Sequence, residues 1–397
     1  MAMEKKVAFI VSQDLARISS LLPSNQKRSL IVHSLIHALG LFNPSPGRAR
    51  IQVITPRRAS YKDLSTFHSK EYLDYILDKD NDGVTNPEFG LQDDAASFIG
   101  LSDYVPLVAG ATLTACETLK QNYSDVAICW DGGRHHTHKS KASGFCYVAD
   151  CVLAILSLKK LVPGPEPRKP RVMYLDLDLH FSDAVSEAFH TPSRPAGSSS
   201  QTLILSIHHA SRGFFPASKL SGLSSISDAE YDPFTLSIPL NVGASDGTYG
   251  RIWPIVERVA RTFSPDYTIV QCGADALAGD PYATFNWSLG SGEGSLGWCI
   301  NRILTSWPGK HLLLGGGGYN SPNVARAWAY LTSLALESPL DLDSPIPEHS
   351  GFPLYGPSFT LDIPAGTMQD QNTEEYLSTI ETSFESVIKD LAERVSN

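Results

Sequence analysis

Short apolar runs recur along the chain, and each is followed by glycine or polar residues. Because the runs are continuous rather than alternating, they are typical of strands buried on both faces of a parallel sheet. They predict strands at 7–12, 51–54, 125–130, 172–176, 203–207, 267–272 and 311–314. Apolar residues at helical spacing predict helices at 26–41, 69–77, 104–119, 145–158, 250–262, 296–306, 323–336 and 373–395. This alternation predicts a three-layer α/β fold with helices on both faces of the sheet.

Three irregular segments interrupt the pattern, but none has the composition of a linker between domains. Residues 161–170 are rich in proline and predict a surface loop, whereas residues 190–201 predict a mobile insertion. Residues 337–370 are irregular but contain large apolar side chains, so we expect them to pack. These side chains are Phe352, Leu354, Tyr355 and Phe359. Since the sequence has no repeat and no low-complexity linker, we predict one domain over residues 1–397.

The charge balance excludes one class of partner. The chain carries 32 Lys and Arg residues against 42 Asp and Glu residues, so its formal net charge is −10. Sequence-independent binding to nucleic acid needs a basic face, so we expect no direct contact with nucleic acid. A basic peptide, such as a lysine-rich tail, is compatible with this charge.

Cysteine spacing and hydropathy indicate the environment of the chain. The six cysteines include no CxxC pair, which argues against a zinc ribbon or a redox dithiol, and they are too few for a disulfide scaffold. A reducing intracellular compartment is therefore expected. The apolar run at residues 7–11 is too short for a signal peptide core, and no run approaches the roughly 18 residues of a membrane span. We expect a soluble protein without membrane contact.

Polar side chains in glycine-rich surroundings follow four of the predicted strands. The strand at 125–130 is followed by DGGRHHTH, and the strand at 172–175 by DLDLHFSD. The strands at 267–272 and 311–314 are followed by GADALAGDP and GGGGYN. In parallel α/β folds, functional sites form at the carboxyl ends of the strands. We therefore expect these His, Asp and Tyr side chains to converge.

One of these motifs carries a candidate metal site. In extended backbone, alternate residues point the same way, so Asp176, Asp178 and His180 can face one point. A polar strand end with capping aspartates would explain this motif alone, but Asp275 after a second strand favours a metal site. Asp178, His180 and Asp275 would supply three ligands and leave an open position for water or substrate, as in catalytic zinc sites.

The adjacent His135 and His136 are candidates for proton transfer. A lone histidine is more often a hydrogen-bonded core residue, but a pair after Gly-Gly at a strand end is harder to explain in that way. In a metal hydrolase, one imidazole can deprotonate the attacking water, and the other can orient or protonate. Asp176 and Asp183, from the neighbouring strand end, are candidates for fixing the imidazole tautomers.

The glycine run at 315–318 presents Tyr319 at the same edge. The run lacks both a following GK[ST] and the GxGxxG spacing, so it does not predict a phosphate site. The phenol of Tyr319 can donate a hydrogen bond to an oxyanion beside a metal-bound carbonyl. A merely packed aromatic ring is the alternative.

Together these residues carry a resemblance. The stretches GGRHHTHKSKASGFCYVAD, YLDLDLHFSD, GFFP, GADALAGDP and GGGGYN match the class I zinc-dependent histone deacetylases in order and spacing. KRSLIVHSLI and LYGPSFTLDI also resemble that class, so the likeness extends from about residue 6 to 395. The compact length is most similar to that of the compact class I members and their fungal relatives. The resemblance implies the arginase/deacetylase fold, in which helices flank a central, mostly parallel sheet of eight strands.

The resemblance also implies roles for individual residues. Asp178, His180 and Asp275 match the zinc ligands, and His135 and His136 match the paired histidines, with His136 as general base and acid. Asp176 and Asp183 match their carboxylate partners, and Tyr319 matches the oxyanion-stabilising tyrosine. The substrate tunnel and rim match Gly144, Phe145, Phe215 and Asp94. The inner potassium site matches Asp176, Asp178, His180, Ser206 and Ile207, and the internal channel matches Arg28.

Four departures from the family pattern concern specificity. The family usually has a second His and two glycines within the stretch 181–184, which here is Phe-Ser-Asp-Ala. Asp93 stands where an aromatic residue is usual, and Tyr282 replaces a Leu or Met at the pocket border. The insertion at 190–201 lies near the loop of the outer potassium ion. These changes affect substrate preference and that outer ion site, and leave the hydrolytic residues intact.

The resemblance implies zinc-dependent hydrolysis of N6-acetyl-lysine in histone tails or other nuclear proteins, with release of acetate. Iron(II) is an alternative metal in the cell, and potassium is a structural ion. The implied partners are acetylated histones, other acetylated proteins such as cohesin subunits, and corepressor subunits, in the nucleus or also in the cytoplasm. The alternatives are an acetylpolyamine deacetylase, a weakly active acetyl-lysine-binding corepressor subunit and a dimanganese hydrolase like arginase.

Overall fold

The computed structural model describes residues 5–45, 47–161, 168–192, 195, 198–282 and 284–395. In this part of the chain, eight strands form one sheet in the order β2-β1-β3-β8-β7-β4-β5-β6, and every pair is parallel. The strands are β1 Lys6–Ile10, β2 Arg50–Ile54, β3 Val126–Cys129, β4 Val172–Asp176, β5 Thr202–His209, β6 Thr235–Leu240, β7 Tyr267–Gln271 and β8 Lys310–Leu314. The α/β prediction is confirmed, with a sheet that is parallel throughout.

Strand β6 is the one strand that the apolar runs did not predict. Its sequence, TLSIPL, is interrupted by a serine and by Pro239, so it forms no continuous apolar run. Because β6 lies at the edge of the sheet, β5 is its only neighbour. A central strand forms backbone hydrogen bonds to neighbours on both sides. Proline has no backbone N–H to donate, so it is tolerated mainly in edge strands.

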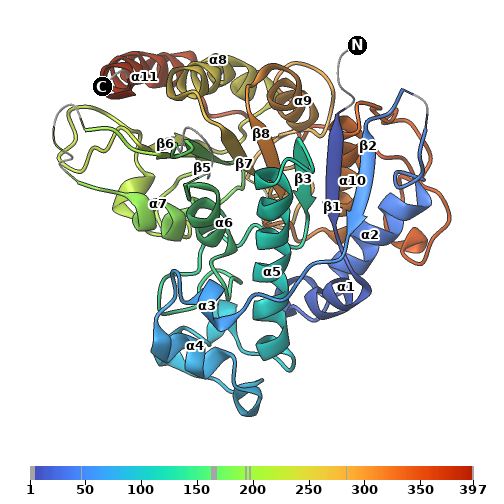
Figure 1. Ribbon diagram of the computed structural model, residues 1–397. Coiled ribbons are helices and arrows are strands. Elements are labelled where there is room, and N and C mark those ends of the chain that lie inside the picture. Colours follow the sequence, from blue (N-terminus) through green and yellow to red (C-terminus); the bar gives the residue numbers. More distant parts are fainter. Residues whose placement is uncertain are drawn as a thin grey trace.

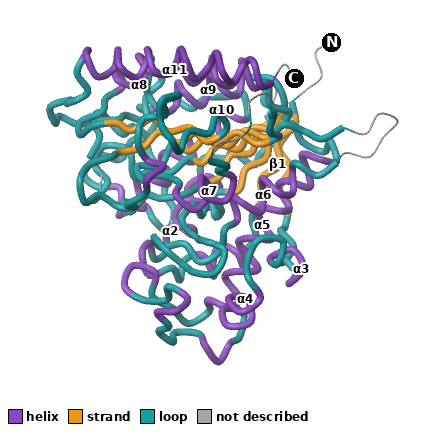
Figure 2. Tube along the Cα trace, turned by 90° about the vertical axis from the view of Figure 1, so that its left-hand side faces the viewer, coloured by secondary structure: helices purple, strands orange, loops and turns teal. Residues whose placement is uncertain are grey.

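The continuous apolar strands bury both faces of the sheet. In β1, Val7 and Phe9 belong to one hydrophobic cluster, whereas Ala8 and Ile10 belong to a second. Helices α8 (Asp246–Phe263), α9 (Leu296–Ser306) and α11 (Glu374–Val395) cover one face of the sheet, and α5 (Leu101–Lys120) and α6 (Asp150–Leu158) cover the other (Figure 2). The result is the three-layer arrangement that the sequence predicts.

The described helices agree in most cases with the predicted ones. They are α1 Gln13–Ser19, α2 Arg28–Ala38, α3 Tyr61–Leu64, α4 Lys70–Ile76, α5 Leu101–Lys120, α6 Asp150–Leu158, α7 Asp183–Phe189, α8 Asp246–Phe263, α9 Leu296–Ser306, α10 Ser321–Ala335 and α11 Glu374–Val395. Short 3-10 helices include η4 Asp93–Ala95 and η6 Phe352–Tyr355. None of the helices that the structure describes is long and apolar enough to cross a bilayer.

The start of α6 differs most from its prediction. The segment predicted to be helical from residue 145 begins its helix, α6, only at Asp150. Gly144 and Phe145 adopt left-handed backbone angles, with φ of 51° and 60°, and Ser143 forms a bridge with Cys146. A right-handed helix cannot contain these angles, so apolar spacing alone misplaced the boundary. The short helices α1, α3 and α7 were not predicted.

The segment 337–370 packs only in part. Tyr355 is buried, and the guanidinium of Arg326 donates hydrogen bonds to the carbonyls of Tyr355 and Thr360. Leu354 is 55% exposed, so the expectation of packing is wrong for this side chain, whereas the half-exposed ring of Phe359 stacks on that of Phe352 at 4.9 Å. Residues 162–167 of the predicted loop, and residues 193, 194, 196 and 197 of the predicted insertion, lie outside the described residues.

The strands that carry the polar motifs are neighbours in the sheet. The order β3-β8-β7-β4 forms the middle of the sheet, although β8 follows β3 by more than 180 residues along the chain (Figure 1). Because all four strands run in the same direction, the loops that follow them meet at one edge. This topology brings together side chains that are far apart in the sequence.

Candidate active site

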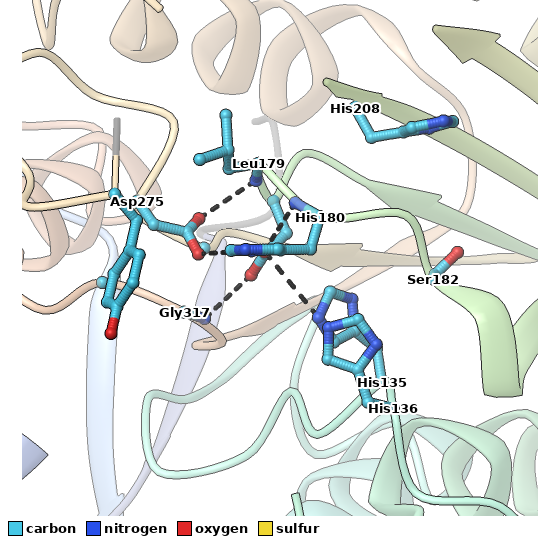
Figure 3. A network of polar contacts seen from close by, with 12 residues as sticks. His135, His136, Leu179, His180, Ser182, His208, Asp275 and Gly317 are labelled. Atoms are coloured by element: carbon cyan, nitrogen blue, oxygen red, sulfur yellow. Dashed lines mark hydrogen bonds and ion pairs between the residues drawn. The ribbon is translucent and has the colours of Figure 1, made fainter. Parts of the chain in front are cut away.

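Two carboxylates and one imidazole meet where β4 and β7 end. Nδ1 of His180 lies 3.2 Å from Oδ1 of Asp178 and 3.1 Å from Oδ2 of Asp275 (Figure 3). One ligand atom from each residue lies within 4.8 Å of the others. The two carboxylates are fully buried, and His180 is nearly so. The structure thus brings together the three residues that the sequence assigned as metal ligands.

Hydrogen bonds from the neighbouring loops orient the two carboxylates. Nε2 of Gln271 and the backbone N–H of Gly317 both donate to Oδ2 of Asp178, at 2.7 and 2.8 Å. The backbone N–H of Leu179 donates to Oδ1 of Asp275 at 3.0 Å. A Cβ atom on Gly317 would lie 2.1 Å from Oδ2 of Asp275, so only glycine fits there. The close approach of the 315–318 backbone is part of the site.

The electrostatics of the three residues fit a divalent cation. Burial and the nearby charge of Asp178 raise the pKa of Asp275 to about 7. Burial disfavours a charged His180, but hydrogen bonds to Asp178 and Asp275 outweigh it and raise its pKa to about 10. The proton on His180 offsets part of the negative charge of Asp178 and Asp275. A bound cation would neutralise the same charge. Carboxylate and imidazole donors of this kind suit zinc or iron(II).

Two His–Asp pairs lie beside these ligands. Nδ1 of His135 is 2.9 Å from Oδ2 of Asp176, and Nδ1 of His136 is 2.7 Å from Oδ1 of Asp183. The ring centroids of the two histidines are 3.9 Å apart. Each carboxylate accepts a hydrogen bond from the ring nitrogen that it faces and so fixes the orientation of that imidazole.

The two imidazoles have opposite pKa shifts. Burial, together with the adjacent His135, lowers the pKa of His136 to about 4, so His136 is neutral near pH 7. Burial also acts on His135, but the Asp176 and Asp178 carboxylates outweigh it and raise its pKa to about 9. A neutral base beside a protonated imidazole is an arrangement suited to acid–base chemistry.

Aromatic rings lie around the two imidazoles. The ring of Phe215, which is 39% exposed, lies 4.9 Å from that of His136, and the ring of Phe145 lies 5.5 Å from that of Tyr319. Gly144 has a φ of 51°, and a Cβ atom there would lie 2.5 Å from Cδ2 of His136. That atom would also lie 2.9 Å from the ring of Phe215. Of the residues assigned to the tunnel, Gly144 and Phe215 therefore lie against His136, and Phe145 lies against Tyr319.

Tyr319 is held as a neutral phenol. Burial, with added effect from Asp275 and Asp178, raises the pKa of its hydroxyl well above the ordinary value. The hydroxyl is therefore a hydrogen-bond donor over the whole physiological pH range. The ring of Tyr282, which is 50% exposed, packs edge-on against that of Tyr319 at 4.8 Å.

The remaining assigned residues occupy three places. Arg28 is buried, and its Nη1 donates to the carbonyl of Gly318 at 2.8 Å, while burial lowers its pKa to about 10. Asp94 is exposed in η4. Ser206 pairs in register with Asp176 between β5 and β4, and its neighbour Ile207 is buried in β5.

Sequence reasoning did not assign Gln271, Asp280 or His138. Gln271 orients Asp178, and the signal was a polar residue at the end of the apolar strand YTIVQ. Asp280 accepts hydrogen bonds from the Tyr319 loop and lies inside a motif that was quoted only for Asp275. Nε2 of His138 lies 3.6 Å from Oδ2 of Asp183. The signal was its position two residues after His136, which the sequence did assign.

Two buried carboxylates and an imidazole that suit a cation lie at the carboxyl edge of a parallel sheet, beside a neutral imidazole and a neutral phenol. This arrangement is typical of a metal-dependent hydrolase with an α/β fold. Comparison with known proteins identifies the family. Residues 22–335 match the histone deacetylase domain. The chain belongs to the histone deacetylase family.

Similar proteins cover nearly the whole chain. "Histone deacetylase 8" of Xenopus tropicalis is 36% identical over 91% of this chain and 92% of its own length. "Histone deacetylase 8" of Danio rerio is 34% identical over 98% of this chain and 96% of its own length. "Histone deacetylase HDAC1" of Drosophila melanogaster is 34% identical over 90% of this chain and 64% of its own length. The resemblance inferred from the motifs is confirmed.

Family membership makes the protein a hydrolase that deacetylates lysine, with a catalytic metal and acetylated protein substrates. These statements follow from the family as a whole.

Proposed function

We propose that the chain hydrolyses N6-acetyl-lysine in histone tails or other nuclear proteins and releases acetate. One observation supports this most strongly: Asp178, His180 and Asp275 converge beside the His136–Asp183 pair. Asp178, His180 and Asp275 would hold one zinc ion, or iron(II) in the cell. We further propose that residues 1–397 act as one catalytic domain.

The protein's own side chains would carry the proton transfers. A bound metal would polarise the acetyl carbonyl and make water a stronger acid. His136, neutral near pH 7, would accept the proton of the attacking water and deliver it to the departing lysine amine. Asp183 would hold the tautomer of His136, and Asp176 would hold His135 as a cation. Tyr319 would donate a hydrogen bond to the substrate oxygen as negative charge develops on it.

The surrounding residues would bind the acetyl-lysine. Phe145 and Phe215 would flank its apolar stem, because flat rings suit a chain of methylene groups. Gly144 leaves room for that stem, and Tyr282 would form the border of the pocket. Asp94, exposed at η4, would accept hydrogen bonds from the substrate backbone.

A potassium ion, an internal channel and several partners complete the proposal. Asp176, Asp178, His180, Ser206 and Ile207 would frame a structural potassium ion, supported by the register of Asp176 with Ser206. Arg28 would line an internal channel. The names of the similar proteins support a histone substrate, and a histone substrate would place the protein in the nucleus, with cytoplasmic protein also expected. Cohesin subunits are further candidate substrates, and corepressor subunits are candidate partners.

A second candidate substrate is an acetylated polyamine. An additional acidic side chain at the pocket border would favour a small cationic substrate, and Tyr282 is not acidic. The deciding experiment measures kcat/KM for acetyl-lysine histone peptides and for acetylpolyamines, with metal analysis of the same sample. We expect peptides to be preferred and one metal ion per chain. Preference for acetylpolyamines would overturn the histone proposal, and two metal ions would favour an arginase-like enzyme.

A further inference from the structure

A single buried carboxylate joins the two loops that carry Asp275 and Tyr319. Oδ2 of Asp280 accepts hydrogen bonds from the backbone N–H groups of Tyr319, at 2.6 Å, and Asn320, at 3.1 Å. Its other oxygen, Oδ1, accepts from the backbone N–H of Tyr282 at 3.0 Å. Asp280 is only 8% exposed. The carboxylate therefore links a loop after β7 to a loop after β8.

The loop before Tyr319 needs such support. Gly316 and Gly318 have φ of 139° and 120°, a region that other residues rarely adopt. Glycine allows many backbone conformations, so the sequence of this loop does not by itself fix where Tyr319 lies. Arg28 holds one end through the carbonyl of Gly318, and Asp280 holds the next two N–H groups.

Asp280 also fixes the residue that packs on the ring of Tyr319. Its bond to the N–H of Tyr282 holds the backbone of that residue. The Tyr282 ring then lies 4.8 Å from the Tyr319 ring with an interplanar angle of 76°, an edge-to-face contact. Asp280 thus acts on the backbone of Tyr319 directly and on its ring through Tyr282.

Keeping this carboxylate buried is costly in free energy. Burial raises the pKa of Asp280, while the three backbone hydrogen bonds oppose that rise. A neutral side chain with the same oxygen, such as asparagine, could accept the Tyr319 bond without that desolvation cost. The geometry uses the ability of Oδ2 to accept the Tyr319 and Asn320 bonds, and only a carboxylate offers a second oxygen for the Tyr282 bond.

We propose that Asp280 is a positioning residue, which holds the hydroxyl of Tyr319 where it can donate to the substrate oxygen. The proposal rests on the function proposed for Tyr319. The opposing interpretation is that Asp280 only stabilises the two loops. The two interpretations differ in one respect: a positioning residue has no further effect on turnover once the Tyr319 hydroxyl is gone.

The test is a double-mutant cycle with Asp280→Ala and Tyr319→Phe, measured as kcat on an acetyl-lysine peptide. In the wild-type background, Asp280→Ala should lower kcat by about 10- to 100-fold, the scale of an approximately 1 Å misplacement. In the Tyr319→Phe background, the same change should lower kcat by less than about twofold, because coupled residues are not additive. Asp280→Asn should keep more of the wild-type kcat than Asp280→Ala, since its amide oxygen can accept the bonds from Tyr319 and Asn320, although its NH2 group cannot accept that from Tyr282.

The controls separate positioning from damage to the fold. Asp266 accepts the backbone N–H of Arg171 at 2.8 Å, at the opposite edge of the sheet, so Asp266→Ala removes a similar contact far from the site. It should leave kcat unchanged. The metal content of every variant should match that of the wild type. If Asp280→Ala does not fold, the same double-mutant cycle is measured with Asp280→Ser in its place.

The outcomes distinguish this proposal from the function on which it rests. If Asp280→Ala lowers kcat by the same factor in both backgrounds, the positioning role is overturned. The role proposed for the Tyr319 hydroxyl is then unaffected. A silent Tyr319→Phe would overturn the oxyanion role, and the positioning role with it. Loss of metal from Asp280→Ala would show that Asp280 acts on Asp275 rather than on Tyr319.

Discussion

Nδ1 of His136 lies 2.7 Å from Oδ1 of Asp183, so the carboxylate accepts the Nδ1–H and leaves Nε2 as the basic nitrogen. Burial keeps this imidazole neutral, with a pKa of about 4, despite the adjacent carboxylate. In turn, His136 and His138 outweigh the effect of burial and hold the pKa of Asp183 well below its ordinary value. The pair is therefore a neutral imidazole with a fixed tautomer.

This pair predicts the effect of removing the base. His136→Ala should lower kcat by roughly two or more orders of magnitude, the usual scale for a lost general acid–base. Asp183→Asn should also lower kcat, because an amide N–H facing Nδ1 favours the wrong tautomer. His135→Ala should lower kcat as well. Steady-state kinetics on an acetyl-lysine peptide measures these effects, with metal content as the control. Near-wild-type kcat in His136→Ala would show that another group is the base.

The metal cluster predicts a loss of both metal and activity. Asp178→Asn removes one anionic ligand, so the variant should bind far less zinc and have no measurable turnover. Metal analysis after dialysis gives a readout that does not depend on turnover. Asp266→Asn, which changes a carboxylate at the opposite edge of the sheet, should retain its metal. An Asp178→Asn, Asp275→Asn double variant with full metal content and activity would rule out this site.

Much of the site could be predicted because it depends on local sequence and on strand direction. Asp178 and His180 are two residues apart after a strand, so their proximity follows from backbone geometry. Asp275 joins them because β7 and β4 are parallel neighbours, and the carboxyl ends of parallel strands share an edge. The first relation needs only the strand pattern, whereas the second also needs β7 and β4 to be neighbours in the sheet.

Other features depend on tertiary contacts that no local pattern encodes. Asp280 meets Tyr319 across 39 residues through backbone N–H groups, which carry no sequence signal. Phe145 has an apolar side chain at helical spacing, but its left-handed backbone is set by the bridge between Ser143 and Cys146. In both cases the surrounding fold, rather than intrinsic preference, determines the conformation.

A buried histidine outside the catalytic cluster predicts how stability depends on pH. The carbonyl of Lys139 lies 3.1 Å from Nδ1 of His68, and Nε2 accepts the N–H of Ala149, so the fold holds a neutral ring. Burial lowers the pKa of His68 from 6.5 to about 4. As the pH falls from 6.5 toward 4, the unfolded chain binds a proton that the folded chain does not. The contribution of neutral His68 to the free energy of unfolding is therefore fully present above pH 6.5 and decreases as the pH falls toward 4.

The size of this effect can be measured with one substitution. Between pH 6.5 and 5, His68 should contribute about 2 kcal/mol to the loss of stability, from the shift of its pKa. His68→Gln should lower the thermal unfolding midpoint at pH 7 but show a smaller further drop at pH 5 than the wild type. His311, buried with a pKa of about 4, is a matched second site for the same comparison. An unchanged pH dependence in His68→Gln would contradict the prediction.

Tyr319 provides the sharpest test between an active deacetylase and a subunit that only binds acetyl-lysine. Its hydroxyl stays protonated, because burial and the charges of Asp275 and Asp178 raise its pKa. Tyr319→Phe keeps the ring and its contacts with Phe145 and Tyr282 and removes only the donor. The expected loss is about 10²–10³-fold in kcat, the range found for other oxyanion donors.

Binding of the substrate should change far less than turnover. A hydrogen bond that forms only as charge develops on the substrate oxygen contributes to the transition state and not to the ground state. The Kd of an acetyl-lysine peptide for Tyr319→Phe should therefore remain within a few-fold of the wild type, and the variant should hold uncut peptide. If Tyr319 is merely a packed ring, kcat and Kd should both be nearly unchanged. Small, equal changes in the two constants would remove the oxyanion role and favour the binding subunit.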